Sequence, residues 1–243
     1  MLEGTLNLEK IESTVLKVCD AVEKYKNAQL HWSTLSEQCL WRELVSCILG
    51  SRVRYETAKA CTEHLDNIGL LDIKDILTNP LAIEKQIFRE LNQPIYPPFT
   101  QRVGSKYRYP KSKAGFIVST GHQLYATKHG SIREILQKSI NGIEARETLV
   151  KNCKGIGPKQ ASLFLRNIGF SEDLAILDCH VNRYIDLIQL DERYRDFIIK
   201  KNNQYFKNEN MLRIYAISKK KSLATMDMGI WIVMRLIKKE KLI

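Results

Sequence analysis

The sequence predicts an all-α protein, and two observations carry this prediction. Apolar residues recur at three- and four-residue steps, as at Leu8, Ile11, Val15 and Cys19, which is the spacing of one face of a helix. Strict alternation of apolar and polar residues, which is typical of a half-buried strand, is scarce. With 243 residues and 44% hydrophobic content, the chain can bury a sizeable core in one large domain or two interleaved ones.

Apolar stripes of the same kind place the helices in order along the chain. We expect helices at 6–25, 37–49, 54–66, 80–91, 112–127, 131–138, 142–151, 158–168, 180–188, 193–206, 209–217 and 223–238. The helix at 158–168 has the clearest limits. Pro158 suits the first position of a helix, and Gly169 suits the position that follows the last turn.

Charge and composition indicate which kinds of partner the protein can bind. Thirty-eight Lys and Arg residues against 27 Asp and Glu give a formal charge of +11, which suits a polyanion such as nucleic acid. No run of about 18 uncharged apolar residues occurs, and the start of the chain lacks a basic region followed by an apolar core. We therefore expect a cytoplasmic protein without a signal peptide or a membrane partner. We also expect it to be a monomer.

Two connecting segments are basic. The segment 92–112 contains four prolines, several aromatic residues and four basic residues, so it is either a surface for nucleic acid or an ordered connector. The stretch "SKKKSL" at 218–223 is either a solvated turn, or a phosphate contact or localisation signal. Neither segment decides the function by itself.

The six cysteines, at 19, 39, 47, 61, 153 and 179, form no CxxC pair and no tight cluster. This spacing argues against a structural zinc site or an iron–sulfur cluster. We expect buried free thiols and no bound metal.

The stretch "KGIGPK", Lys154 to Lys159, predicts a tight hairpin between the helices at 142–151 and 158–168. Gly155 and Gly157 allow a sharp bend and a close approach to another molecule, since glycine has no Cβ. Exposed N–H groups at such a turn and helix start can bind phosphate, although similar turns are also a common structural device.

Lys159 stands in the first turn of the second helix, where the helix dipole disfavours a cation. It is either an ordinary surface lysine or a nucleophile, because burial there would favour the neutral amine that attacks carbon.

Nineteen residues later, four residues that are mostly apolar lead to Asp178 and an amphipathic helix. Asp178 is expected to be an N-cap, and its carboxylate can also face a developing positive charge. His180 is expected to be a hydrogen-bonded structural residue rather than a ligand or base.

These motifs together resemble the helix-hairpin-helix DNA glycosylase superfamily, and most closely its archaeal-type 8-oxoguanine DNA glycosylase/AP lyase family. The resemblance covers about 37–234. It rests on "LWRELVSCILGSRVRYETA" at 40–58, "YRYPKSKAGFIV" at 107–118, "GIGPKQASLFLRNIG" at 155–169, "AILDCHVNRYI" at 175–185 and "MDMGIWIV" at 226–233.

The resemblance implies that Lys159 is the Schiff-base nucleophile and Asp178 the essential carboxylate, both at a basic cleft between two helical lobes. It also implies DNA-binding residues at Lys154, Gly155, Ile156, Gly157 and Arg52. Arg52 aligns with the residue that fills the gap left by a flipped base or contacts the opposite base, where relatives carry Asn or Gln. No cofactor is expected beyond a monovalent cation at the hairpin.

Two residues are expected in the base pocket. Trp231 either stacks on the extruded base or packs the C-terminal helix through its apolar body. Asp227, one helical turn earlier, is either a base contact or a solvated helix residue.

The resemblance implies three parts in the chain: 1–44 and 171–243 form the first lobe, and 45–170 forms the central lobe with the hairpin. It implies a bifunctional DNA glycosylase/AP lyase of base excision repair, acting on damaged double-stranded DNA at the nucleoid. The lesion is expected to be 8-oxoguanine. The alternatives are a glycosylase for another modified base and a non-catalytic DNA-binding module, although a phosphate clamp needs neither Lys159 nor Asp178.

Overall fold

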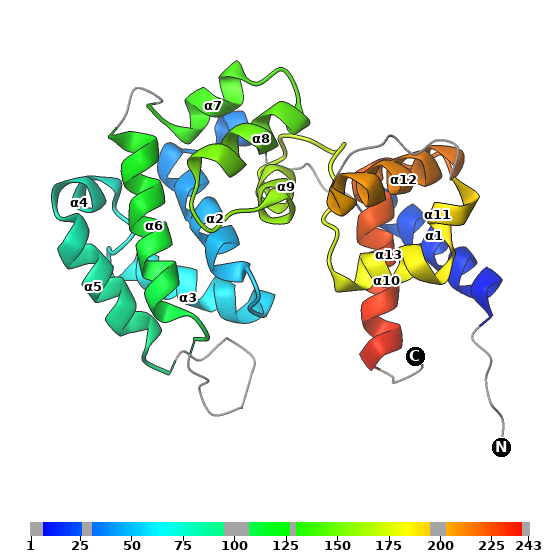
Figure 1. Cartoon of the computed structure of the whole chain (residues 1–243), viewed down its shortest axis with the longest axis horizontal. Coiled ribbons are helices and arrows are strands. Elements are labelled where there is room, and N and C mark those ends of the chain that lie inside the picture. Colours follow the sequence, from blue (N-terminus) through cyan, green and yellow to red (C-terminus); the bar gives the residue numbers. More distant parts are fainter. Residues whose placement is uncertain (1–6, 26–30, 95–106, 127–129, 195–202, 240–243) are drawn as a thin grey trace. The chain divides into compact units, whose positions relative to one another are not determined.

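The computed structural model describes residues 7–25, 31–94, 107–126, 130–194 and 203–239, and all regular structure in these ranges is helical (Figure 1). The chain divides into two compact units, Leu30–Phe170 and the combination of Met1–Gln29 with Ser171–Ile243. Within the described ranges, every helix is too short or too polar to cross a membrane.

The unit Leu30–Phe170 is built around one buried helix. Its elements are η1 (Trp32–Thr34), α2 (Glu37–Gly50), α3 (Tyr55–Asn67), α4 (Ile73–Thr78), α5 (Pro80–Leu91), α6 (Pro110–Tyr125), α7 (Ile132–Lys138), α8 (Gly142–Asn152) and α9 (Pro158–Asn167). Helix α2 contacts α3, α6, α7 and α9. Its Trp41 is buried and donates its indole N–H to the carbonyl of Leu71 at 3.1 Å. Burial of a side chain of this size makes α2 the centre of the unit.

The other unit joins the first helix of the chain to the last four. Its elements are α1 (Leu8–Lys24), α10 (Cys179–Leu187), α11 (Leu190–Arg193), α12 (Gln204–Ser218) and α13 (Leu223–Lys239). Helix α13 contacts α1, α10 and α12, and α1 crosses it at Gly229. A Cβ at Gly229 would lie 2.5 Å from Cys19 Sγ, so only glycine allows this close crossing.

The predicted helices differ from the observed ones in several places, and the short elements η1 and α11 were not predicted. Helix α4 was not predicted, because its six residues give a single turn of apolar spacing, at Ile73, Ile76 and Leu77, which is too short to indicate a helix by itself. Residues 195–202 of the helix predicted at 193–206 lie outside the described residues. The predicted break between residues 206 and 209 is wrong. Helix α12 runs without interruption from Gln204 to Ser218, and the buried polar residues Asn208 and Glu209 disturb its apolar periodicity.

The limits of the units also differ in detail from the predicted ones. The predicted limit after residue 44 falls inside α2, which packs throughout on the unit Leu30–Phe170. Residues 95–106 of the predicted connector 92–112 lie outside the described residues, and α6 already begins at Pro110.

Candidate active site

The hairpin before Lys159 has the predicted form. Helix α8 ends at Asn152 and α9 begins at Pro158, and Gly155 between them has φ +75°. A Cβ at Gly155 would overlap the ring of Phe116, whereas one at Gly157 would have nothing within 4 Å. Gly155 is therefore needed for the fold of the turn, and Gly157 leaves the turn open on its outer side.

The hairpin is attached to α6 by a polar contact as well. The backbone N–H of Lys154 donates to Thr120 Oγ1 at 2.9 Å, and Thr120 is fully buried. The side chain of Lys154 is exposed. Thr120 holds the hairpin from the inner side and so leaves Lys154 able to meet an anion on the outer side.

Two other predicted DNA-binding residues differ in what they can offer a ligand. Ile156 is 6% exposed, so its side chain belongs to the core and only its backbone can face a ligand. Arg52 is exposed and has φ +63°, in the turn between α2 and α3. A non-glycine residue in this left-handed region is uncommon and needs support from its surroundings.

Lys159 is the second residue of α9 and is half-buried. Gly157 is the N-cap of this helix and provides no side-chain cap, so the first-turn amides stay available for an anion. Among the residues that the structure describes, none forms a hydrogen bond or ion pair with the ammonium group of Lys159. The amine is therefore not engaged in a structural role within this part of the chain.

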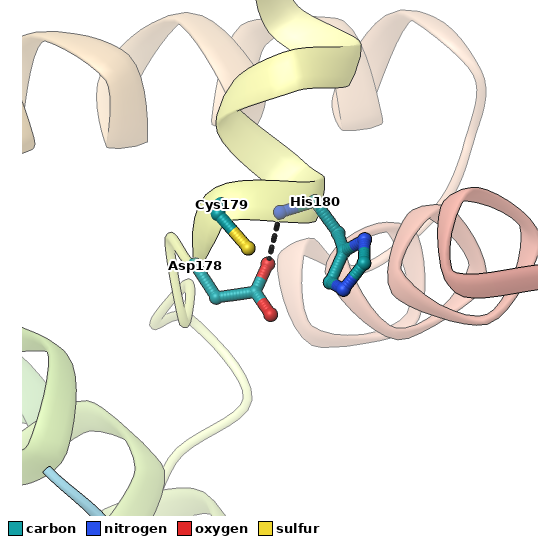
Figure 2. Close-up of side chains that lie close together, drawn as sticks. All are labelled: Asp178, Cys179 and His180. Atoms are coloured by element: carbon teal, nitrogen blue, oxygen red, sulfur yellow. Dashed lines mark hydrogen bonds between the residues drawn. The ribbon is translucent and has the colours of Figure 1, made fainter. Parts of the chain in front are cut away.

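Asp178 caps α10, as predicted (Figure 2). Its Oδ1 accepts hydrogen bonds from the N–H groups of His180 at 2.8 Å and Val181 at 3.0 Å. Asp178 is half-buried, and no described residue donates to its Oδ2. One carboxylate oxygen fixes the side chain while the other remains available for an external positive charge.

Cys179 and His180 flank the same carboxylate (Figure 2). One donor atom each of Asp178, Cys179 and His180 lies within 4.8 Å of the others, so these three side chains could hold a divalent cation. The imidazole of His180 has no hydrogen bond to any described residue, so the expected structural bond is not observed. Cys179 and Cys39 are exposed, which corrects the expectation that all six thiols are buried.

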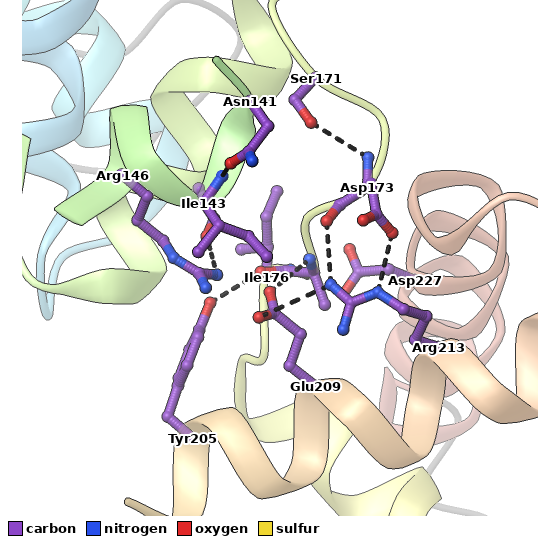
Figure 3. Close-up of polar contacts among 12 residues, drawn as sticks. Asn141, Ile143, Arg146, Ser171, Asp173, Ile176, Tyr205, Glu209, Arg213 and Asp227 are labelled. Carbon is purple, nitrogen blue, oxygen red and sulfur yellow. Dashed lines mark hydrogen bonds and ion pairs between the residues drawn. The ribbon is translucent and has the colours of Figure 1, made fainter. Parts of the chain in front are cut away.

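The segment before Asp178 is irregular backbone, and side chains of α12 and α13 bind polar groups of Ala175 and Ile176 in it (Figure 3). Glu209 accepts the N–H of Ala175 at 3.0 Å, and the hydroxyl of Tyr205 donates to the Ala175 carbonyl at 2.7 Å. Asp227 Oδ1 accepts the N–H of Ile176 at 2.9 Å. Glu209 and Asp227 are 3% and 2% exposed, so the segment is anchored by two buried carboxylates.

A second set of amide groups completes this anchoring. The side-chain amide of Asn182 donates to the carbonyls of Leu177 and Asp178, and Asn208 donates to Asn182 Oδ1 at 2.9 Å. The side chain of Asn182 therefore links the start of α10 to α12. Sequence reasoning did not identify Tyr205, Glu209 or Asn182, because each acts on backbone that it reaches only in the folded chain.

The two residues predicted to line the base pocket, Asp227 and Trp231, both contact other parts of their own unit. Asp227 is not a solvated helix residue, since it is buried and binds the backbone of Ile176. Trp231 is half-buried and packs against the core that α1, α10, α12 and α13 share. The guanidinium carbon of Arg235 lies 4.9 Å from the centre of the Trp231 ring. One part of the Trp231 side chain is packed and another remains accessible.

Helical units in the described ranges, with a glycine-containing hairpin between two helices and a lysine directly after it, are typical of the lysine-bearing branch of helix-hairpin-helix DNA glycosylases. The chain belongs to the 8-oxoguanine DNA glycosylase family, whose model matches residues 20–221. The predicted family and fold class are confirmed.

Relatives and solved structures agree with this membership. The 8-oxoguanine DNA glycosylase/AP lyase of Sulfolobus acidocaldarius is 31% identical over 232 residues, which are 95% of this chain and 96% of that protein. The crystal structure of the Methanocaldococcus jannaschii 8-oxoguanine DNA glycosylase matches with a TM-score of 0.63 and 27% identity, over 92% of this chain and 91% of that one. A structure of the glycosylase/lyase of the same organism, in complex with 15mer DNA containing 8-oxoguanine, matches with a TM-score of 0.57 and 25% identity, over 95% and 91%.

Proposed function

We propose that this protein is a bifunctional 8-oxoguanine DNA glycosylase/AP lyase that acts on damaged double-stranded DNA in base excision repair. The observation that carries the proposal is the place of Lys159, half-buried in the uncapped first turn of α9 and directly after the hairpin. The name of the Sulfolobus acidocaldarius relative and the 8-oxoguanine DNA in the Methanocaldococcus jannaschii complex support the choice of lesion.

The hairpin holds the DNA backbone. The N–H groups of Gly157 and of the first turn of α9 bind a phosphate, aided by the dipole of that helix and by the exposed cation of Lys154. A monovalent cation bound at the hairpin would assist the same contact. These contacts position the strand without reading its sequence. Arg52 enters the duplex when the damaged base leaves the stack, which costs a few kcal/mol.

Asp178 and Lys159 then divide the chemistry. As the bond between the base and C1′ breaks, the electrons leave with the base, and the Asp178 carboxylate stabilises the positive charge on the sugar. The neutral amine of Lys159 forms a bond to C1′ and loses a proton. The bond between C1′ and O4′ then opens, O4′ takes up a proton, and a protonated imine remains. Loss of a C2′ proton expels the 3′ phosphate by β-elimination.

We further propose that the chemical steps need no organic cofactor and no divalent metal ion, because the lysine supplies the nucleophile and the carboxylate supplies the charge. The enzyme would act as a cytoplasmic monomer at the nucleoid. Activity should be retained in excess EDTA, which would not be the case if a divalent ion at Asp178, Cys179 and His180 were required.

Borohydride trapping tests the proposal. Wild-type protein mixed with an 8-oxoguanine duplex and borohydride should form a covalent protein–DNA adduct, and an undamaged duplex should not. Lys159→Gln should abolish the adduct and leave duplex affinity within about threefold, because one charge among many phosphate contacts is a small loss. Lys154→Gln, five positions earlier, is the matched control and should still be trapped. An undiminished adduct in Lys159→Gln would place the nucleophile elsewhere. A panel of other modified bases identifies the lesion.

A further inference from the structure

The C-terminal end of α2 is capped from three directions by buried side chains. Its last carbonyl groups accept hydrogen bonds as follows: Cys47 from Gln160 Nε2 at 2.6 Å, Ile48 from Lys113 Nζ, and Leu49 from the hydroxyl of Tyr107. Gln160, Lys113 and Tyr107 are 6%, 4% and 3% exposed. The last carbonyls of a helix usually face water or a glycine turn, so three buried donors at one helix end are a specific arrangement.

The turn that carries Arg52 begins at this capped end. Ser51 N–H donates to the Ile48 carbonyl and Val53 N–H to the Gly50 carbonyl, both at 3.4 Å, which is long for a backbone hydrogen bond. Arg52 itself has a left-handed backbone. Because the turn has weak internal bonds, its conformation depends on where the three donors hold the end of α2.

Lys113 also belongs to the face of α6 that holds the hairpin. Residues Lys113, Phe116 and Thr120 follow one another at three- and four-residue steps, so they share one side of the helix. Phe116 fills the space beside Gly155, and Thr120 accepts the N–H of Lys154. A single helix face therefore contacts the base of the Arg52 turn at one end and the hairpin at the other.

The remaining donor, Gln160 of α9, also connects the end of α2 to the hairpin region. It follows Lys159 directly in α9 and reaches the Cys47 carbonyl, 113 positions earlier in the chain. The turn that carries Arg52 and the helix that carries Lys159 are thus fixed to one another by buried hydrogen bonds inside one compact unit. Buried hydrogen bonds of this kind are costly to break, because the carbonyl left behind has no water to replace the donor.

We propose that Lys113 is a positioning residue that sets the spacing between the Arg52 turn and the hairpin, so that both engage one duplex together. This inference rests on the proposed function. Extrusion of a base needs the hairpin to hold the strand while a side chain takes the place of the base, so a loose turn slows extrusion. At a preformed abasic site no base has to be unstacked, so the lyase reaction there depends much less on this spacing.

The positive charge of Lys113 suits a residue that holds the C-terminal end of α2. Its ammonium group points at a carbonyl at the negative end of the α2 dipole, where a positive charge is favoured. Burial, with a smaller effect of Arg52, lowers the pKa of Lys113 to about 8. Lys113 therefore acts at the end of α2 and does not serve as a surface contact for DNA.

Lys113→Met tests the inference, because methionine fills similar space without a donor. Lys111→Met, an exposed lysine in the first turn of the same helix, is the matched control. In single-turnover assays we expect Lys113→Met to slow 8-oxoguanine release from a paired duplex about tenfold or more. β-Elimination at a preformed abasic site should change less than about threefold, and Lys111→Met should change neither reaction by more than about twofold. Equal losses on both substrates would overturn the inference.

A double-mutant cycle with Arg52→Ala sharpens the result. If Lys113 acts through Arg52, the double variant should release the base no more than about twofold more slowly than Arg52→Ala alone. Fully additive effects would show that Lys113 acts independently. If Lys113→Met does not fold, Tyr107→Phe replaces it, because this change removes only a hydroxyl group that donates to the same helix end. Tyr107→Phe should also slow base release more than β-elimination, by a smaller factor.

A separate measurement distinguishes failure of this inference from failure of the proposed function. A 2-aminopurine beside the lesion reports unstacking in the Lys159→Gln background, where no chemistry is needed. Lys113→Met should reduce the fluorescence rise on binding, and Lys111→Met should not. If wild-type protein fails to release 8-oxoguanine, the proposed function is wrong, while the fluorescence comparison still decides the role of Lys113.

Discussion

The hairpin before Lys159 and the segment before Asp178 are both irregular backbone at the start of a helix, but their polar groups are satisfied in opposite ways. The first turn of α9 has no side-chain cap, and Gly157 opens onto free space. The segment before Asp178 has its N–H groups bound by the buried carboxylates of Glu209 and Asp227. A loop that binds phosphate must leave amides unpaired, whereas a segment that only carries a catalytic side chain must satisfy them internally.

Because of this difference, we expect substitutions in the two regions to affect different quantities, DNA affinity in one and the stability of the fold in the other. Changes on the outer side of the hairpin should alter DNA affinity more than folding. Changes around the Asp178 segment should alter folding more than DNA affinity, unless they touch the carboxylate itself.

The largest effect is expected at Asp178. Asp178→Asn should slow base release about 100-fold, or about 3 kcal/mol of barrier, because the negative charge opposite the sugar is lost. Asparagine still caps α10, so the free energy of unfolding should change by less than about 1 kcal/mol. Single-turnover kinetics and urea denaturation measure the two quantities. Asp178→Ala, which loses the cap as well, is the control for stability. Wild-type excision by Asp178→Asn would leave the carboxylate only its structural role.

The two glycines of the hairpin should separate the inner side of the loop from the outer one. Gly155→Ala forces a side chain into the left-handed region and against Phe116, so it should destabilise the protein by about 2–3 kcal/mol. Gly157→Ala has open space and should change stability by less than about 1 kcal/mol. It should weaken binding to undamaged duplex several-fold, since the added methyl group keeps phosphate away from the backbone. Equal effects of the two changes in urea denaturation would contradict this distinction.

Asp227 should behave as a structural acceptor. Asp227→Ala leaves the partly buried N–H of Ile176 without this acceptor and should destabilise the protein by about 1–2 kcal/mol. Asp227→Asn keeps an acceptor oxygen at the same place and should cost less. Duplex affinity should stay within about twofold for both variants, because the side chain is buried. A large loss of affinity for 8-oxoguanine duplex alone would instead return Asp227 to the base pocket.

Local signals in the sequence were enough for the hairpin and for the cap at Asp178. Glycine, proline and a capping carboxylate act on neighbours within a few residues, so their structural roles can be predicted without the fold. The supports of both sites could not be predicted in this way. Asp227 acts on backbone 51 positions earlier in the chain, and Lys113 on a carbonyl 65 positions earlier. Such partners are set by helix packing, and a buried Lys or Asp looks like a surface residue in a sequence.

The smallest effect is expected at Lys154, whose side chain is exposed on the outer side of the hairpin. Its backbone N–H binds Thr120, so a change of side chain leaves that contact in place. Lys154→Met should lower duplex affinity a few-fold and reduce the slope of log affinity against log salt by about 0.9, which corresponds to one phosphate contact. Damaged and undamaged duplexes should be affected alike, because a phosphate contact carries no sequence information. The unfolding midpoint in urea should not move. Lys151→Met, an exposed lysine in the last turn of α8, is the control, and an equal change of salt slope in both variants would mean that the basic surface binds DNA without using the hairpin.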